Sequence, residues 1–182
     1  SFWTLPRPFR LEPVIGDLLL SQIDKKTLLA AIRQRISVQL QGLLASQRAT
    51  QEGAVHEETR AEGAKDTRAT EASYLARGLA ERAESLRSDL ERLDAFAPAL
   101  LDGTEPAQPG ALVRIEEEGR GDSVYFLLPF GGGESVTLDG STIRVISPLS
   151  PIGRMLVGRE RGEEFSIDLP RGETLFAVKD VS

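Results

Sequence analysis

The sequence predicts an α+β protein, in which an N-terminal antiparallel α-helical coiled-coil hairpin precedes a small antiparallel β domain with one short helix. Apolar residues recur every three or four positions in residues 24–101, which is the spacing of helices that pack along a seam. Residues 102–110 are rich in Pro and Gly and predict a linker, and the apolar period falls to about two in residues 111–182. Residues 1–23 hold three prolines and the only Trp without a sustained period, so we expect an N-terminal extension there.

The helical region is predicted to form two arms of similar length. Asp24 is the expected N-cap, because its carboxylate can accept hydrogen bonds from the free amides of the first turn. Each helix alone would expose its apolar stripe, so we expect the two to fold back on each other. At ~1.5 Å rise per residue each arm is about 45 Å long, which puts the charged residues 56–66 at the far tip. The two stripes consist of Leu28, Leu29, Ile32, Ile36, Leu40, Leu43 and Leu44, and of Ala72, Leu75, Leu79, Ala83, Leu86, Leu90 and Leu93.

The C-terminal region is predicted to be a sheet with one helical interruption. A short helix is expected at residues 150–158, with Pro151 at its first position, where a missing N–H is harmless. The stretch FGGGES (130–135) is expected to be a hairpin turn, because a phosphate-binding loop needs a helix after it and here a strand follows. The candidate strands are residues 111–117, 123–129, 141–147, 164–169 and 174–181.

Composition excludes several classes of function. A net charge of −6 argues against nucleic acid as a self-sufficient target, because phosphate binding needs a clustered excess of Lys and Arg. The absence of Cys excludes disulfides, thiolate metal sites and thiol catalysis, and it fits a reducing cytoplasm. No apolar run is long enough to span a membrane. His56 is the only histidine, so any catalytic triad or histidine-bearing metal site would need it.

The predicted tip gathers carboxylates, which are the hard oxygen ligands that Mg²⁺ prefers. If the tip were helical, Glu58 and Glu62, or Glu62 and Asp66, would share one face, and like charges held that close repel unless a cation is present. The set is too small for a complete metal site, which suggests a part offered to another molecule's active site. The alternative is a solvated loop whose acidic residues are neutralised by nearby basic ones. The carboxylates are Glu57, Glu58, Glu62 and Asp66, and the basic residues are Arg60, Lys65 and Arg68.

The stretch RVISPLSPIGRMLVGRERGEEFSIDLPRG (144–172) resembles the C-terminal signature of the bacterial GreA/GreB transcript cleavage factors. Residues 71–86, EASYLARGLAERAESL, resemble the helical hairpin of the same family more loosely, and together the two likenesses cover residues 24–182. The signature positions are Ser150, Pro151, Ile152, Gly153, Arg154, Leu156, Gly158, Gly162, Glu163, Pro170 and Gly172.

This resemblance implies a coiled coil joined to a domain like that of FK506-binding proteins (FKBP-like), in a cytoplasmic bacterial protein. It implies RNA polymerase as the partner, with the coiled coil entering the secondary channel and contact with the nascent RNA 3′ end, and indirectly with DNA, only inside that complex. Glu58 and Glu62, with Glu57 and Asp66 as alternates, would hold a Mg²⁺ shared with the polymerase and assist cleavage of backtracked RNA. Ser150, Pro151 and Arg154 would lie at the polymerase contact. The resemblance implies a monomeric accessory factor with no cofactor of its own rather than an enzyme.

Other functions stay open because the tip departs from the family pattern. That pattern has an acidic residue, two intervening positions and then Glu-Asn-Ala, whereas here Thr59 stands three positions before Glu62 and Glu58 fits only with a shift of one residue. An anti-cleavage inhibitor of the same fold and a non-catalytic coiled-coil adaptor are therefore alternatives. A prolyl isomerase is disfavoured, because such enzymes line a pocket with many aromatic residues. Residues 111–182 offer only Tyr125, Phe126, Phe130, Phe165 and Phe176, several of which must face the core, and no Trp.

Overall fold

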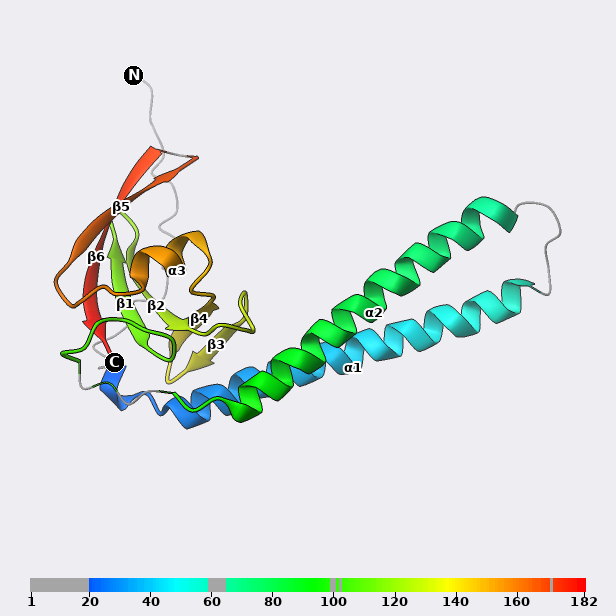
Figure 1. Cartoon of the computed structure of the whole chain (residues 1–182), viewed down its shortest axis with the longest axis horizontal. Coiled ribbons are helices and arrows are strands. Elements are labelled where there is room, and N and C mark those ends of the chain that lie inside the picture. Colours follow the sequence, from blue (N-terminus) through cyan, green and yellow to red (C-terminus); the bar gives the residue numbers. More distant parts are fainter. Residues whose placement is uncertain (1–19, 59–64, 99–100, 102, 171) are drawn as a thin grey trace, which may run out of the picture.

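The computed structural model describes residues 20–58, 65–98, 101, 103–170 and 172–182, and for residues 50–58, 65–69 and 169 it describes the backbone alone. Two long helices form a projection from a globular domain that contains one sheet and one short helix (Figure 1). The predicted fold class, a helical hairpin followed by a β domain with one short helix, is confirmed. The elements are the 3-10 turn η1 (Leu20–Gln22), α1 (Lys25–Glu58), α2 (Lys65–Ala95), β1 (Leu112–Glu117), β2 (Gly121–Leu127), β3 (Ser135–Leu138), β4 (Ser141–Ile146), α3 (Pro151–Leu156), β5 (Glu164–Leu169) and β6 (Gly172–Val181).

The first long helix begins where its capping residue predicts. The carboxylate of Asp24 accepts hydrogen bonds from the backbone N–H groups of Lys26 (3.2 Å) and Thr27 (3.1 Å), and also from the Thr27 hydroxyl. Two of the four unpaired amides of the helix start are thereby satisfied. The predicted N-cap is confirmed.

We call the two long helices together the rod. They lie side by side near the globular domain and diverge toward the far end (Figure 1). Near the domain, the guanidinium of Arg33 binds the carboxylate of Asp94 at 2.7 Å, and the seam residue Leu86 is buried. Further out, Ala72 is exposed and the Leu75 side chain is 56% exposed. The prediction that these two residues lie in a buried seam is wrong, because the helices diverge before reaching them.

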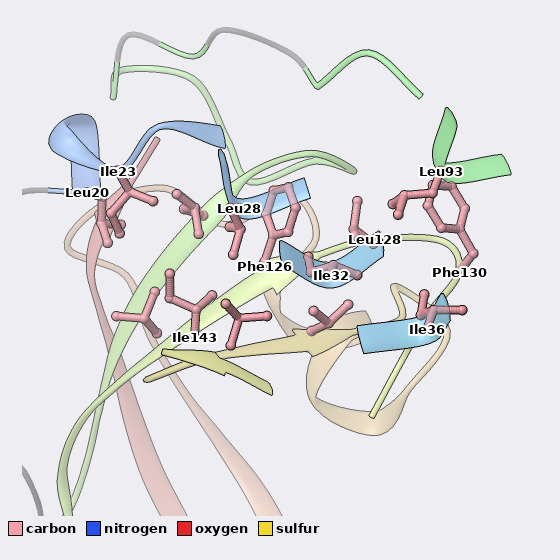
Figure 2. Packing of buried hydrophobic residues seen from close by; sticks show 14 of the residues in the cluster. Leu20, Ile23, Leu28, Ile32, Ile36, Leu93, Phe126, Leu128, Phe130 and Ile143 are labelled. Atoms are coloured by element: carbon pink, nitrogen blue, oxygen red, sulfur yellow. The ribbon is translucent and has the colours of Figure 1, made fainter. Parts of the chain in front are cut away.

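The root of α1 packs against the sheet as well as against α2 (Figure 2). The fully buried stripe residues Leu28, Ile32 and Ile36 share one hydrophobic cluster with Phe126 and Leu128. The sequence predicted that this stripe packs against the other helix. It packs against the sheet as well, and the spacing of apolar residues in α1 does not distinguish these two partners. Leu20 and Ile23, just before the helix, are buried in the same cluster. The root of the rod is therefore attached to the sheet through a shared hydrophobic core as well as through the chain connection.

The sheet has the strand order β3-β4-β2-β1-β6-β5 and is mixed. The prediction of a purely antiparallel domain is wrong at one pair, because β2 and β4 run parallel, with Val124 opposite Ile143. The chain leaves β2, returns along the edge as β3, and inserts β4 between the two. Asp139 and Gly140, with φ of 49° and 78°, make the tight β3–β4 turn. Residues 128–134 connect strands that are not neighbours, so the FGGGES stretch is not a hairpin turn.

Two hydrophobic cores lie against opposite faces of the sheet. One contains η1 and the helix roots, and the other contains α3 and buried residues of the 101–111 segment. All five aromatic side chains of residues 111–182 are at most 7% exposed and belong to these cores. The aromatic rings that an isomerase pocket would need are therefore used for packing. Phe126 and Phe130 lie in the first core, and Tyr125, Phe165 and Phe176 in the second.

Candidate functional site

Three of the four predicted tip residues lie in the ends of α1 and α2 that are remote from the globular domain (Figure 1). Glu57 and Glu58 are the last two residues of α1, and Asp66 is the second residue of α2. Glu62 lies outside the described residues, as do the side chains of the other three. The helix bounds thus place three of the four candidates at the end of α1 and the start of α2, while their use as ligands stays a prediction.

The helix ends themselves give the tip an electrostatic character. The C-terminus of a helix carries a partial negative charge from its unpaired carbonyls, so Glu57 and Glu58 stand where acidic residues are unfavourable. Asp66 stands at a helix N-terminus, where a carboxylate is favoured. Two glutamates at the end of α1 therefore do not add to the stability of that helix.

The second candidate region is the α3 turn, which we define as residues 147–154. Ser150 is the N-cap of α3: its hydroxyl donates to the Ser147 carbonyl (2.7 Å) and accepts from the Gly153 N–H (3.0 Å). The Ser147 hydroxyl accepts from the Leu149 N–H at 3.1 Å. A Cβ at Gly153 would lie 2.0 Å from the Ser147 carbonyl oxygen, so only glycine fits. These contacts hold the turn in one conformation.

The structure separates the predicted contact residues into two roles. Pro151 and Arg154 are exposed on the α3 turn and available to a partner. Ser150 is half-buried and its hydroxyl is engaged within the turn, so it positions the segment. The expected packing residues behave as predicted, because Leu156 is fully buried and Ile152 packs against the second core.

Sequence reasoning missed Leu149, the most exposed large apolar residue described. Its side chain is 80% exposed on the rigid α3 turn, and Val157 at the other end of α3 is 42% exposed. A single exposed apolar side chain is common on protein surfaces, so Leu149 is a candidate contact because of its place beside the exposed Pro151 and Arg154 on the α3 turn. The available signal was the placement of Leu149 between two proline-bearing dipeptides in SPLSP, where a packed helix or strand cannot continue.

The C-terminal end of α3 is fastened to the rest of the domain. The guanidinium of Arg159 donates to the Met155 carbonyl at 3.2 Å and lies 5.3 Å from the centre of the Phe165 ring. The backbone of Arg159 accepts from the Ala107 N–H at 2.8 Å, which ties the 101–111 segment to the same place. The exposed side chains of the α3 turn are thus carried by a rigid base.

Two further searches of the described part of the chain bear on the site. No helix there combines the length and the apolar character needed to cross a membrane. No three acidic or histidine side chains come together there in a way that could hold a metal ion, and the side chains of the tip lie outside that search.

Comparison with known proteins relates the chain to one family. A family profile described as "Transcription elongation factor, GreA/GreB, C-term" matches residues 104–182. Transcription elongation factor GreA of Solidesulfovibrio magneticus is 30% identical over 140 residues, which cover 77% of this chain and 77% of that protein. GreA of Desulfovibrio desulfuricans is 37% identical over 73 residues, so the matched stretch spans only 42% of the length of that relative.

Solved structures are similar to the chain at lower identity. Gfh1 of Thermus aquaticus is 22% identical, with coverage of 84% of this chain and 94% of that one and a TM-score of 0.34. A GreA/GreB factor of Nitrosomonas europaea is 24% identical, with coverage of 53% and 78% and a TM-score of 0.32.

Proposed function

Because the chain belongs to the GreA/GreB family of bacterial transcription elongation factors, we propose that it binds RNA polymerase and stimulates the cleavage of backtracked RNA. The polymerase performs the hydrolysis, in the bacterial cytoplasm, and this chain acts as a monomeric accessory factor. Its contact with the RNA 3′ end occurs only inside the polymerase complex.

The single observation that carries this proposal is the length of the rod beyond the globular domain. Ile36 is the last residue of α1 that is buried in the first core. From Ile36 to Glu58 the helix continues for about 33 Å at 1.5 Å per residue. An acidic tip that far from the domain can enter a channel while the domain stays at the rim. The predicted reach of about 45 Å counted turns that are packed on the sheet.

The tip carboxylates are the proposed working groups. Glu58 and Glu62 are the first choice, with Glu57 and Asp66 as alternates, and their oxygen donors fit a hard divalent cation. A Mg²⁺ ion shared with the polymerase would supply charge stabilisation and an activated water for phosphodiester hydrolysis. The residues of this chain complete the ligand set of that ion and do not need to form a site alone.

The α3 turn is the proposed docking surface. Leu149, Pro151 and Arg154 are exposed on a backbone that internal hydrogen bonds hold fixed, so little conformational entropy is lost on binding. Leu149 supplies apolar area, and the Arg154 guanidinium suits an acidic surface on the polymerase. Ser150 acts indirectly, through the hydrogen bonds that shape the turn.

The test is RNA cleavage in stalled, backtracked elongation complexes. Wild-type protein should yield shortened RNA, and the double variant Glu58→Gln, Glu62→Gln should lose at least about 100-fold in cleavage rate, which is the scale of removing one electrostatic contributor to a transition state. The same variant should keep its affinity for polymerase, measured by direct binding, because the docking surface is unchanged.

Two matched controls and one further variant sharpen the result. Glu81→Gln and Glu84→Gln neutralise exposed carboxylates along α2 away from the tip, and they should leave cleavage intact. Glu57→Gln with Asp66→Asn tests the alternates. If wild-type protein binds polymerase and yields no shortened RNA, the cleavage proposal fails.

A second candidate, an anti-cleavage factor, is favoured by one observation at the tip. Thr59 stands where the family pattern has an acidic residue, three positions before Glu62. An inhibitor would occupy the channel without completing the metal site, so wild-type protein would compete with an authentic cleavage factor and slow RNA shortening. The variant Thr59→Asp distinguishes the two, since restoring the spacing should then create cleavage activity.

A further inference from the structure

The 130–134 loop, FGGGE, lies between the root of the rod and the edge of the sheet, and none of the contacts proposed above uses it. Its last residue, Glu134, is bound by two side chains of α1. The Arg35 guanidinium lies 3.0 Å from one carboxylate oxygen, and the Gln39 amide donates to the other. The Glu134 side chain is only 12% exposed, so this carboxylate is held mostly out of water by a helix.

The first residue of the loop contacts the other helix of the rod. The ring of Phe130 packs edge-to-face against Phe96, with centroids 5.4 Å apart and planes at 83°. The guanidinium carbon of Arg92 lies 5.9 Å from the same ring centre. Phe130 is 7% exposed and closes the first core at the end of α2, beside Leu93 and Ile36 (Figure 2).

The backbone between these two residues is fixed to both sides. A Cβ at Gly131 would lie 3.3 Å from Cδ1 of Ile36, so the loop backbone runs directly against α1. Gly131 also has a φ of 63°, which favours glycine. The Gly133 N–H donates to the Val145 carbonyl (3.0 Å) and the Glu134 carbonyl accepts from the Val145 N–H (2.8 Å). One short loop therefore joins α1, α2 and β4.

We propose that the 130–134 loop is the joint that sets the direction of the rod relative to the docking surface, and that Glu134 is a positioning residue for the tip. This rests on the proposed function, because direction matters only if the tip must reach a fixed point in a partner. A rotation of the root by about 10° would move a tip about 33 Å away by about 6 Å, which is more than a metal ligand can tolerate.

The chemistry of the joint favours a directional role. An apolar contact alone permits sliding, whereas a carboxylate with two donors four residues apart on α1 fixes that helix in rotation and along its axis. The carboxylate comes from the sheet edge and both donors come from the rod. The contact of Glu134 with Arg35 and Gln39 therefore depends on the angle between the rod and the sheet.

The direct test is a distance measurement, and the chain suits it because it contains no cysteine. Spin labels are attached at Ser73→Cys on the exposed surface of α2 and at Asp168→Cys on the edge strand β5. The labelled protein should give one narrow distance distribution by pulsed electron paramagnetic resonance. Glu134→Ala should broaden that distribution or add a second distance. The charge-swapped pair Arg35→Glu, Glu134→Arg should narrow it again, because the ion pair is rebuilt and the Gln39 amide can accept as well as donate.

The functional arm uses the same variants in the cleavage assay. Glu134→Ala should raise the factor concentration needed for half-maximal cleavage by roughly threefold to tenfold, the loss expected for a partly buried charged hydrogen bond, and the charge swap should restore it. A stability role alone would lower the melting temperature and leave the distance distribution narrow. Glu134→Gln keeps the side-chain shape and a hydrogen bond to Gln39 but removes the charge. This variant takes the place of Glu134→Ala in both experiments if the alanine variant does not fold.

The outcomes separate this proposal from the proposed function. An unchanged distance distribution in Glu134→Ala overturns the joint. A broadened distribution with unchanged cleavage, in a protein whose wild type is active, overturns the role of Glu134 in positioning the tip. If wild-type protein shows no cleavage activity while the distances behave as expected, the proposed function fails and the mechanical part of the joint stands. The tip variant Glu58→Gln, Glu62→Gln should lose cleavage with a distance distribution identical to that of wild type.

Discussion

At the scale of single residues, glycines in the chain serve opposite purposes. Gly153 has no room for a side chain, because the Ser147 carbonyl oxygen occupies the place where a Cβ would be. Gly42, on the exposed surface of α1, has nothing within 4 Å of that place. The first glycine is required by close packing, and the second only weakens a helix.

The variant Gly153→Ala should lower the free energy of unfolding by about 2 kcal/mol, the usual cost of forcing extra volume into a packed site. Gly42→Ala should raise it by about 0.5–1 kcal/mol, because alanine restricts the unfolded chain and favours the helix. Urea denaturation measures both. Equal and small effects at the two positions would contradict the packing of the α3 turn.

Leu149 allows binding to be separated from stability. Leu149→Ala should leave the free energy of unfolding within about 0.5 kcal/mol of wild type, since the side chain is 80% exposed. It should weaken polymerase binding about fivefold, because roughly 1 kcal/mol of apolar burial at the contact is lost. The control is Leu175→Ala, an exposed leucine on β6. Equal affinity of the wild type and both variants for polymerase would remove Leu149 from the docking surface.

At the scale of elements, α1 does two jobs along one face. Ile32 and Ile36 are buried against the sheet and α2, while Leu40, Leu43 and Leu44 further along are only half-buried. The turns of α1 near the domain are therefore stabilised by packing against the sheet. The turns further out are stabilised by packing against α2. The start of the helix, capped by Asp24, belongs to the better-packed half.

The cap makes α1 sensitive to acid. The pKa of Asp24 is lowered from its ordinary value of 3.8, first by the hydrogen bond from the Thr27 side chain and then by those from the Lys26 and Thr27 amides. A lowered pKa means that the charged form stabilises the fold at higher pH, and this contribution disappears as the pH falls through the lowered value. The difference in unfolding free energy between wild type and Asp24→Ala should be largest near neutral pH and should shrink below pH 3.8.

Urea denaturation at a series of pH values checks this. The difference in unfolding free energy between wild type and Thr27→Ala should show part of the same pH dependence, because the Thr27 hydroxyl is the largest cause of the lowered pKa of Asp24. An offset between wild type and Asp24→Ala that stays constant from neutral pH down to about pH 2 would contradict the role of the cap.

The same elements show what a sequence can predict. Helix and strand types follow from local periodicity, and the Asp24 cap and the Ser150–Pro151 helix start follow from chemistry within four residues. The partner of the α1 stripe could not be predicted, because Ile32 has the same spacing whether it meets a helix or a sheet. The parallel β2–β4 pair depends on a strand inserted later in the chain, which local patterns do not encode. At the site, the exposure of Leu149 depends on what does not pack over it.

At the scale of the whole molecule, the proposed function requires a set distance between tip and domain. Deleting one heptad from each arm, residues 42–48 and 79–85, keeps the phase of the apolar stripes and shortens the rod by about 10 Å. The shortened protein should bind polymerase and fail to stimulate cleavage. It should also inhibit the full-length protein by competition, which a titration of the two together measures. Undiminished cleavage by the shortened protein would show that reach does not limit the activity.

The two cores on opposite faces of one sheet have a mechanical consequence. Tyr125 and Phe126 are neighbours in β2, yet Tyr125 packs on the side of α3 and Phe126 on the side of α1. A bending load on the root of α1 therefore reaches the proposed docking surface through the single layer of the β-sheet. The root of the rod should therefore keep a nearly constant orientation relative to the sheet. Thermal motion of the far end should come from bending of the two helices rather than from rotation at their root.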